Sequence, residues 1–123
     1  QMDDVIEIVK AYKLEGIFAT KTTIGREGLK TEKLRIDQIG EGGLSGLPLK
    51  DQSTRIIKYI HERSGGKIPI IGVGGIHSIE DALEKLNAGA SLIELYTGFI
   101  YEGPGLIKRI NKELVRRAGN INP

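Results

Sequence analysis

Three short apolar segments alternate with helix-like segments along this chain, and this order constrains the fold more than any other feature. Residues 16–20, 67–76 and 91–99 are rich in β-prone side chains, and each is bounded by glycines or polar residues. The segments around them place apolar residues at helical spacing. Alternation of this kind predicts parallel strands joined by right-handed crossovers. We therefore expect an α/β fold with three parallel strands.

Helical patterns and one long polar segment fill the rest of the chain. The helical patterns cover residues 3–14, 48–66, 77–90 and 102–119. Ser53 or Thr54 is expected to cap the second helix, and Ser78 the third, with Asp81 three positions later. Residues 21–48 are polar and rich in glycine, and we expect a loop there. A loop this long is more often functional than incidental.

Length and composition fit one soluble segment, residues 1–123, with no linker that divides it. A net charge of +2 is too balanced to indicate a nucleic-acid or membrane-binding surface. The chain has no cysteine, and His61 and His77 lack a third ligand at metal spacing, so we expect no metal site. A barrel of eight βα units needs about 250 residues. The chain is therefore either a small open sheet or part of a larger barrel.

Polar residues and glycines follow each predicted strand, where parallel α/β folds carry their chemistry. These residues are Thr20, Lys21 and Thr22 after the first strand, Gly74 and Gly75 after the second, and Tyr96 and Thr97 after the third. Taken alone, Gly74 and Gly75 favour a simple tight turn, and Thr97 would then only cap the following helix. Two such ends on neighbouring strands instead suit a phosphate. Gly46, in the sequence GGLSG, adds a further flexible approach.

No acid–base constellation is evident among the remaining residues. Glu80 and Asp81 are interpreted as charges that favour a helix N-terminus, and His61 as a solvated helical side chain. No Ser-His-Asp arrangement is visible. If the protein is an enzyme, we expect its reacting group to be a cofactor or to lie outside these residues.

Three ordered motifs resemble the C-terminal part of dihydroorotate dehydrogenase. They are ATKTT (19–23), GEGGLSGLPLKDQSTRIIKYI (40–60) and the stretch from IPIIGVGG to EGPGLI (68–107), in which LYTGFIYEGP is similar to the quinone-linked class 2. The resemblance implies an FMN-binding (β/α)8 TIM barrel, of which this chain would be the last three βα units. It also implies FMN-dependent oxidation of dihydroorotate to orotate, with quinone as electron acceptor, in pyrimidine biosynthesis.

The resemblance assigns roles to the strand-end residues. It implies FMN contacts at Thr20, Gly46, Gly74, Gly75, Tyr96 and Thr97, and substrate contacts at Lys21 and Thr22. The family usually has Asn where this chain has Lys21. An amide both donates and accepts hydrogen bonds, whereas an ammonium only donates and carries charge. Substrate recognition at that edge is therefore expected to differ.

Several parts of the family's enzyme precede the resembling region. These are the serine base, a lysine that contacts the flavin, most substrate asparagines and the helices that meet the bacterial or mitochondrial inner membrane. We therefore expect no catalytic residue in this soluble segment and no activity from it alone. Its expected partner is the remainder of the barrel. The alternatives are a piece of another phosphate-binding or FMN-dependent barrel oxidoreductase, and a non-catalytic part-barrel that self-associates through open edges.

Overall fold

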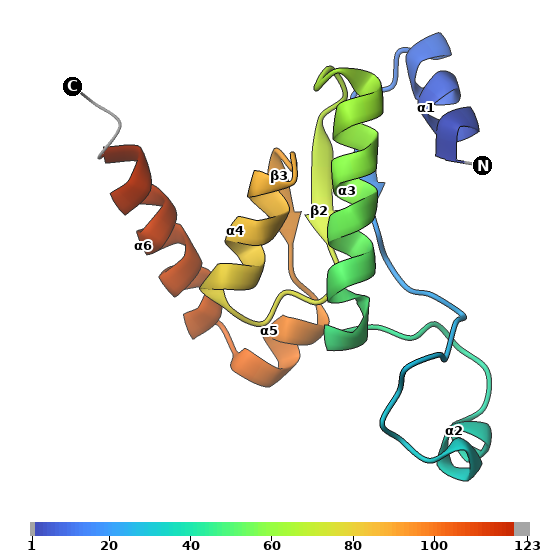
Figure 1. Cartoon of the computed structure of the whole chain (residues 1–123). Helices are drawn as coiled ribbons and strands as arrows, with labels where there is room; N and C mark the ends of the chain where they lie inside the picture. The colour runs from blue at the N-terminus through green and yellow to red at the C-terminus, as the bar shows by residue number, and fades with distance from the viewer. Residues whose placement is uncertain (1, 120–123) are drawn as a thin grey trace.

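The computed structural model describes residues 2–119, which form an open α/β assembly (Figure 1). The strands are β1 (Ile17–Ala19), β2 (Ile70–Val73) and β3 (Leu92–Glu94). The helices are α1 (Met2–Ala11), α2 (Lys33–Ile39), α3 (Lys50–Ser64), α4 (Ile79–Asn87), α5 (Thr97–Glu102) and α6 (Gly105–Gly119), with a 3-10 turn η1 (Leu47–Leu49) before α3.

The three strands form one parallel sheet in the order β1-β2-β3, as the alternation predicts. Ile17 pairs with Ile70, and Ile71 pairs with Leu92. Each strand is shorter than its apolar segment. Because the strands are parallel and in register, their C-terminal ends meet at one edge of the sheet.

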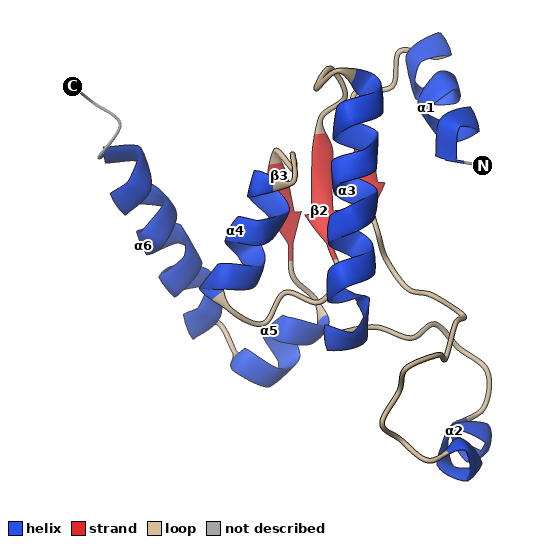
Figure 2. Ribbon diagram, viewed as in Figure 1, coloured by secondary structure: helices blue, strands red, loops and turns tan. Residues whose placement is uncertain are grey.

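Helices cover only one face of this sheet (Figure 2). Helix α3 packs on β1 and β2, and α4 packs on β2 and β3. One core cluster joins α1, α3 and the first two strands through Ile6, Ile57 and Ile70, and a second joins α4 to α6 through Ala82 and Ile110.

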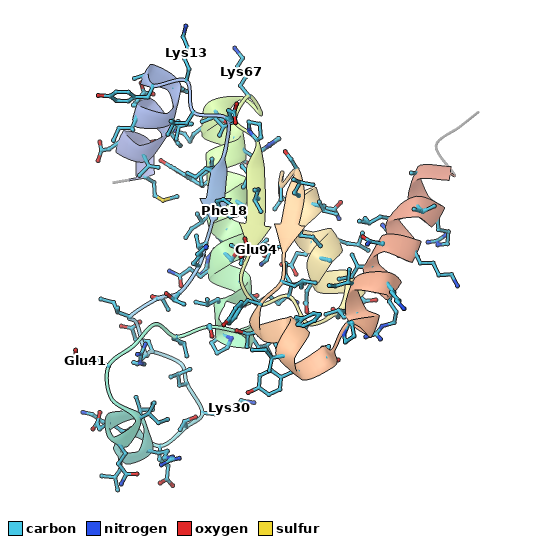
Figure 3. The ribbon with its side chains drawn as sticks, turned by 180° about the vertical axis from the view of Figure 1, so that it is seen from behind. Lys13, Phe18, Lys30, Glu41, Lys67 and Glu94 are labelled. Atoms are coloured by element: carbon cyan, nitrogen blue, oxygen red, sulfur yellow. The ribbon has the colours of Figure 1, made fainter. Side chains whose placement is uncertain are left out.

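The opposite face of the sheet is open to solvent. Seen from behind, Phe18 of β1 and Glu94 of β3 lie in front of the sheet, and no helix within residues 2–119 crosses them (Figure 3). Phe18 is 53% exposed and Leu92 is 62% exposed. Burying apolar side chains of this size is worth about 1.5–3 kcal/mol each. Covering this face would therefore stabilise the sheet.

The segment 21–48 is not the continuous loop that its composition predicts. It contains α2 and η1, and an isolated antiparallel bridge between Thr23 and Leu44 closes the loop at its base. Helix α2 buries no residue, and its Leu34 is 70% exposed. Prediction from apolar periodicity misses such a helix, because it has no buried stripe.

The predicted N-cap of α3 is wrong, whereas the predicted N-cap of α4 is confirmed. Helix α3 begins at Lys50, so Ser53 and Thr54 lie inside it. Gly65 ends it in the left-handed conformation. Ser78 caps α4, and its Oγ accepts a hydrogen bond from the Asp81 N–H at 3.1 Å.

The predicted strand over 91–99 is too long at its C-terminal end. Residues 97–102 form α5, with Tyr96 at the N-cap position, so Thr97 is the first helical residue rather than the cap. Phe99 has strong β propensity and continues the apolar run of the predicted strand. The helix forms despite that propensity, with Gly98, its second residue, buried against the Ile76 carbonyl.

Candidate functional site

A cavity of about 250 Å³ lies at the C-terminal edge of the sheet. Seven predicted site residues line it, namely Lys21, Thr22, Gly46, Gly74, Gly75, Tyr96 and Thr97. They come from the ends of all three strands and from the segment before η1. The structure therefore brings together residues that lie up to 76 positions apart in the sequence, from Lys21 to Thr97.

Thr20 is the predicted residue that does not line the cavity. Its N–H donates a hydrogen bond to the Val73 carbonyl at 3.0 Å, and it therefore joins the ends of β1 and β2. Its own carbonyl oxygen lies 3.0 Å from where a Cβ on Gly74 would be. Thr20 thus forms part of the wall behind the glycine pair.

The glycine pair after β2 is shaped by the close approach of α3. A Cβ on Gly75 would lie 2.5 Å from both the Cα and the N of Lys50, and Gly75 has φ +73°. Only glycine suits such a position. Within residues 2–119, the N–H groups of Gly74 and Gly75 donate to no protein group. Two main-chain donors are therefore left for a ligand at the cavity.

The end of β3 packs against the GGLSG segment. Thr97 Oγ1 donates to Ser45 Oγ at 3.0 Å, and the Thr97 Cγ2 methyl lies 2.9 Å from where a Gly46 Cβ would be. Ser45 lines the cavity but was not predicted, although it adjoins Gly46 in the motif. The hydroxyl pair places two polar groups beside the glycine donors.

Charge in the cavity comes from two side chains among the residues that the structure describes. Lys21 is exposed, with its Nζ 5.3 Å from the centre of the Phe18 ring, in the range of a cation–π contact. Glu94 lines the same cavity from β3. The mobile ammonium of Lys21 can reach an anion at the cavity mouth.

Four charged residues next to the cavity, Lys50, Asp81, Glu84 and Lys85, form a network that sequence reasoning missed. Lys50 Nζ pairs with Asp81 Oδ1 at 2.7 Å and with Glu84 Oε2 at 3.3 Å. Lys85 is fully buried, and Asp81 is 6% exposed. Asp81 is in the first turn of α4, as interpreted, but its main partner is Lys50. Lys85 follows Ala82 by three positions, so helical spacing does place a lysine on the buried face.

Residues 2–119 contain neither a metal-binding cluster nor a membrane-spanning helix. No group of three or more His, Cys, Asp or Glu side chains in that range is placed to hold a metal ion. No helix in that range has both the length and the apolar character needed to cross a membrane.

Comparison with known proteins gives a consistent family. The family model described as dihydroorotate dehydrogenase matches residues 1–117. The chain is 56% identical over 117 residues to the dihydroorotate dehydrogenase (quinone) of Christiangramia forsetii, covering 95% of this chain and 33% of that protein. It is 48% identical over 129 residues to the protein of the same name from Thermosynechococcus vestitus, covering 100% of this chain and 35% of the relative. The chain thus spans about one third of their length.

Solved structures agree with the sequence relatives. Ligand-free DHODH from Eimeria tenella superposes with a TM-score of 0.83 at 35% identity, covering 96% of this chain and 32% of that one. The same protein in complex with ferulenol gives a TM-score of 0.79 at 36% identity, over 97% and 31% of the two chains. The fold is therefore confirmed as a three-stranded α/β portion of a (β/α)8 TIM barrel. The chain belongs to the dihydroorotate dehydrogenase family, and its named relatives place it in the quinone-linked class 2.

Proposed function

We propose that this chain supplies the phosphate end of the FMN site in a quinone-linked dihydroorotate dehydrogenase. The observation that carries the proposal is the single cavity that joins the ends of all three strands. Gly74 and Gly75 would hold the phosphate through main-chain N–H groups, and Tyr96 and Thr97 would contact it from the neighbouring strand end. Gly46 lines the same cavity and completes the proposed cofactor contacts, while Thr20 would support them from the wall behind the glycine pair.

The shape and donors of the cavity suit part of a cofactor. Sites for whole cofactors usually enclose about 300–1,000 Å³. A cavity of about 250 Å³ suits the phosphate and its adjoining chain rather than the complete cofactor. Free main-chain N–H groups and a nearby ammonium are appropriate partners for a phosphate dianion. The walls around the flavin ring would then come from elsewhere in the barrel.

The proposed reaction is the oxidation of dihydroorotate to orotate in pyrimidine biosynthesis. FMN, held by Gly74, Gly75, Tyr96 and Thr97, would supply the redox chemistry of hydride acceptance and electron delivery to quinone. This chain's contribution would be to bind and orient the cofactor. Lys21 and Thr22 follow β1 at the cavity mouth, where we propose that they face the substrate.

The open face of the sheet indicates what the chain would pack against. Phe18, Ile71 and Leu92 lie on that face, and the chain spans about one third of its relatives. We propose that the remainder of the barrel covers them, and that the complete enzyme lies peripherally on a membrane. None of the described side chains is assigned a catalytic role.

FMN and riboflavin together test the cofactor proposal, because they differ only in the phosphate. Flavin fluorescence titrations of the 123-residue chain should give weak binding of FMN and still weaker binding of riboflavin. Equal affinities for the two flavins would contradict a phosphate site. Inorganic phosphate should compete with FMN if the phosphate provides most of the contacts.

A second assay tests the proposed division of roles within the barrel. Mixing the isolated chain with dihydroorotate, FMN and a quinone analogue should give no turnover above a chain-free control. Measurable turnover that depends on the chain would show that it contains the reacting groups. The matched control is a complete relative, which should turn over under the same conditions.

A further inference from the structure

A fully buried lysine stands behind the cavity without lining it. Lys85 of α4 has 0% of its surface exposed. Its Nζ donates to the Lys50 carbonyl and to Thr54 Oγ1, both at 2.6 Å. A buried ammonium is unfavourable unless it is hydrogen-bonded, and burial lowers the pKa of Lys85. Both acceptors lie at the start of α3, so this side chain links α4 to the first turn of α3.

That first turn of α3 is the surface against which the glycine pair rests. A Cβ on Gly75 would lie only 2.5 Å from the Cα and the N of Lys50, so the main chain of Lys50 packs directly against Gly75. Thr54 Oγ1 also donates to the Lys50 carbonyl at 3.0 Å. Any movement of the Lys50 main chain would therefore move the Gly74–Gly75 loop or open a gap beneath it.

The Lys50 side chain also holds the C-terminal end of the Gly74–Gly75 loop, through Asp81 and His77. Its Nζ pairs with Asp81 Oδ1 at 2.7 Å, while Asp81 Oδ2 accepts the His77 N–H at 3.0 Å. Ser53, one turn further along α3, donates from its Oγ to the Val73 carbonyl at 2.6 Å. The segment between Val73 and His77 is thus held at three points: at Val73 by Ser53, at Gly75 by the main chain of Lys50, and at His77 by Asp81.

We propose that Lys85 is a positioning residue for the anion site: by holding the main chain of Lys50, it sets where the N–H groups of Gly74 and Gly75 point. The inference rests on the proposed function, in which those groups hold the FMN phosphate. Lys85 itself does not line the cavity. Its role requires a hydrogen-bond donor at the end of a long side chain, so packing alone does not replace it.

The test compares Lys85→Met with Lys58→Met in the 123-residue chain. Methionine keeps an unbranched apolar side chain of nearly the length of lysine but cannot donate to Lys50. Lys58 lies on the exposed side of α3, with its side chain 67% exposed, and provides the matched control. Circular dichroism establishes that each variant folds. The readouts are the backbone amide signals and hydrogen exchange of Gly75 and His77, and the ratio of FMN to riboflavin affinity.

Lys85→Met should shift the Gly75 amide signal, speed its exchange and lower the FMN-to-riboflavin ratio about tenfold, the size of one charge-assisted hydrogen bond. Lys58→Met should change none of these. A folded Lys85→Met chain with unchanged Gly75 and His77 amides and an unchanged flavin ratio would overturn the inference. If Lys85→Met does not fold, Thr54→Val removes one of the two acceptors and must produce the same amide changes at smaller amplitude, or the inference fails.

The two readouts keep the two proposals separate. If the unmodified chain does not prefer FMN to riboflavin, the proposed function fails. The amide readout still decides whether Lys85 controls the position of the glycine pair, because it needs no ligand.

Discussion

Replacing Gly75 by alanine tests the packing at the glycine pair directly. The added Cβ would lie 2.5 Å from the Lys50 Cα and N, and the residue would keep φ +73°. A left-handed conformation costs an L-residue about 1–2 kcal/mol. Overpacking a filled site costs typically about 1–3 kcal/mol. The Lys50 main chain is held by Lys85, so it cannot yield cheaply, and we expect a total loss of about 2–5 kcal/mol in the free energy of unfolding.

Gly65→Ala is the matched control for this variant. Gly65 has φ +63°, similar to that of Gly75, but no atom lies within 4 Å of where its Cβ would be. Only the conformational cost of about 1–2 kcal/mol should therefore appear. Urea unfolding followed by circular dichroism, with linear extrapolation, measures both variants. If their losses agree within about 0.5 kcal/mol, the close contact with Lys50 contributes nothing and the reasoning is refuted.

Three smaller perturbations test other parts of the site. Ser78→Ala removes the cap of α4 and should cost about 1 kcal/mol in thermal or urea unfolding, and an unchanged stability would contradict the capping role. Burial raises the pKa of Asp81, but hydrogen bonds from Lys50 and the His77 N–H outweigh it, so the folded-state pKa lies below its ordinary value of 3.8. The stability that this carboxylate contributes should be complete above pH 3.8 and should be lost as the pH drops through the lower folded-state pKa. Urea unfolding across that pH range should show a smaller loss of stability in Lys50→Met than in the unmodified chain. An equal loss in both would exclude a contribution from the ion pair. Lys21→Met should weaken FMN binding severalfold at low salt and much less at high salt, whereas an equal loss at both would show that Lys21 acts other than through its charge.

Most of the architecture follows from local pattern, and the errors have physical causes. Parallel strands, the Ser78 cap and the Gly65 helix end depend on side-chain type and spacing within a few residues, so they are readable from sequence. The start of α3 is not, because Ser53 uses its hydroxyl on the Val73 carbonyl instead of capping a helix. Helix α5 is also hidden, since it is short, its β-prone residues are largely exposed, and Gly98 is the residue it buries.

The candidate site is predictable to a similar extent. Residues at strand ends converge because parallel strands in register must end together, and that requirement placed Gly74, Tyr96 and Lys21 at one cavity. The network of Lys50, Asp81 and Lys85 was missed, since a lysine in a helix is usually solvated. Its burial depends on contacts between α3 and α4 that no local pattern encodes.

The glycines around the cavity are explained by contact between loops before any ligand is considered. Gly75 admits the main chain of Lys50, Gly46 admits the Thr97 methyl, and Gly98 lies directly against the Ile76 carbonyl. Because glycine has no Cβ, each of these positions allows a strand-end loop to pack closely against another such loop or against the start of α3. The loops therefore form one continuous surface whose free N–H groups are already oriented. Binding to such a surface does not have to order the loops, so more of the contact energy appears as affinity. The close packing that requires glycine and the N–H groups without a backbone partner occur at the same cavity-lining residues, so a turn and a ligand site are compatible interpretations of the glycine pair.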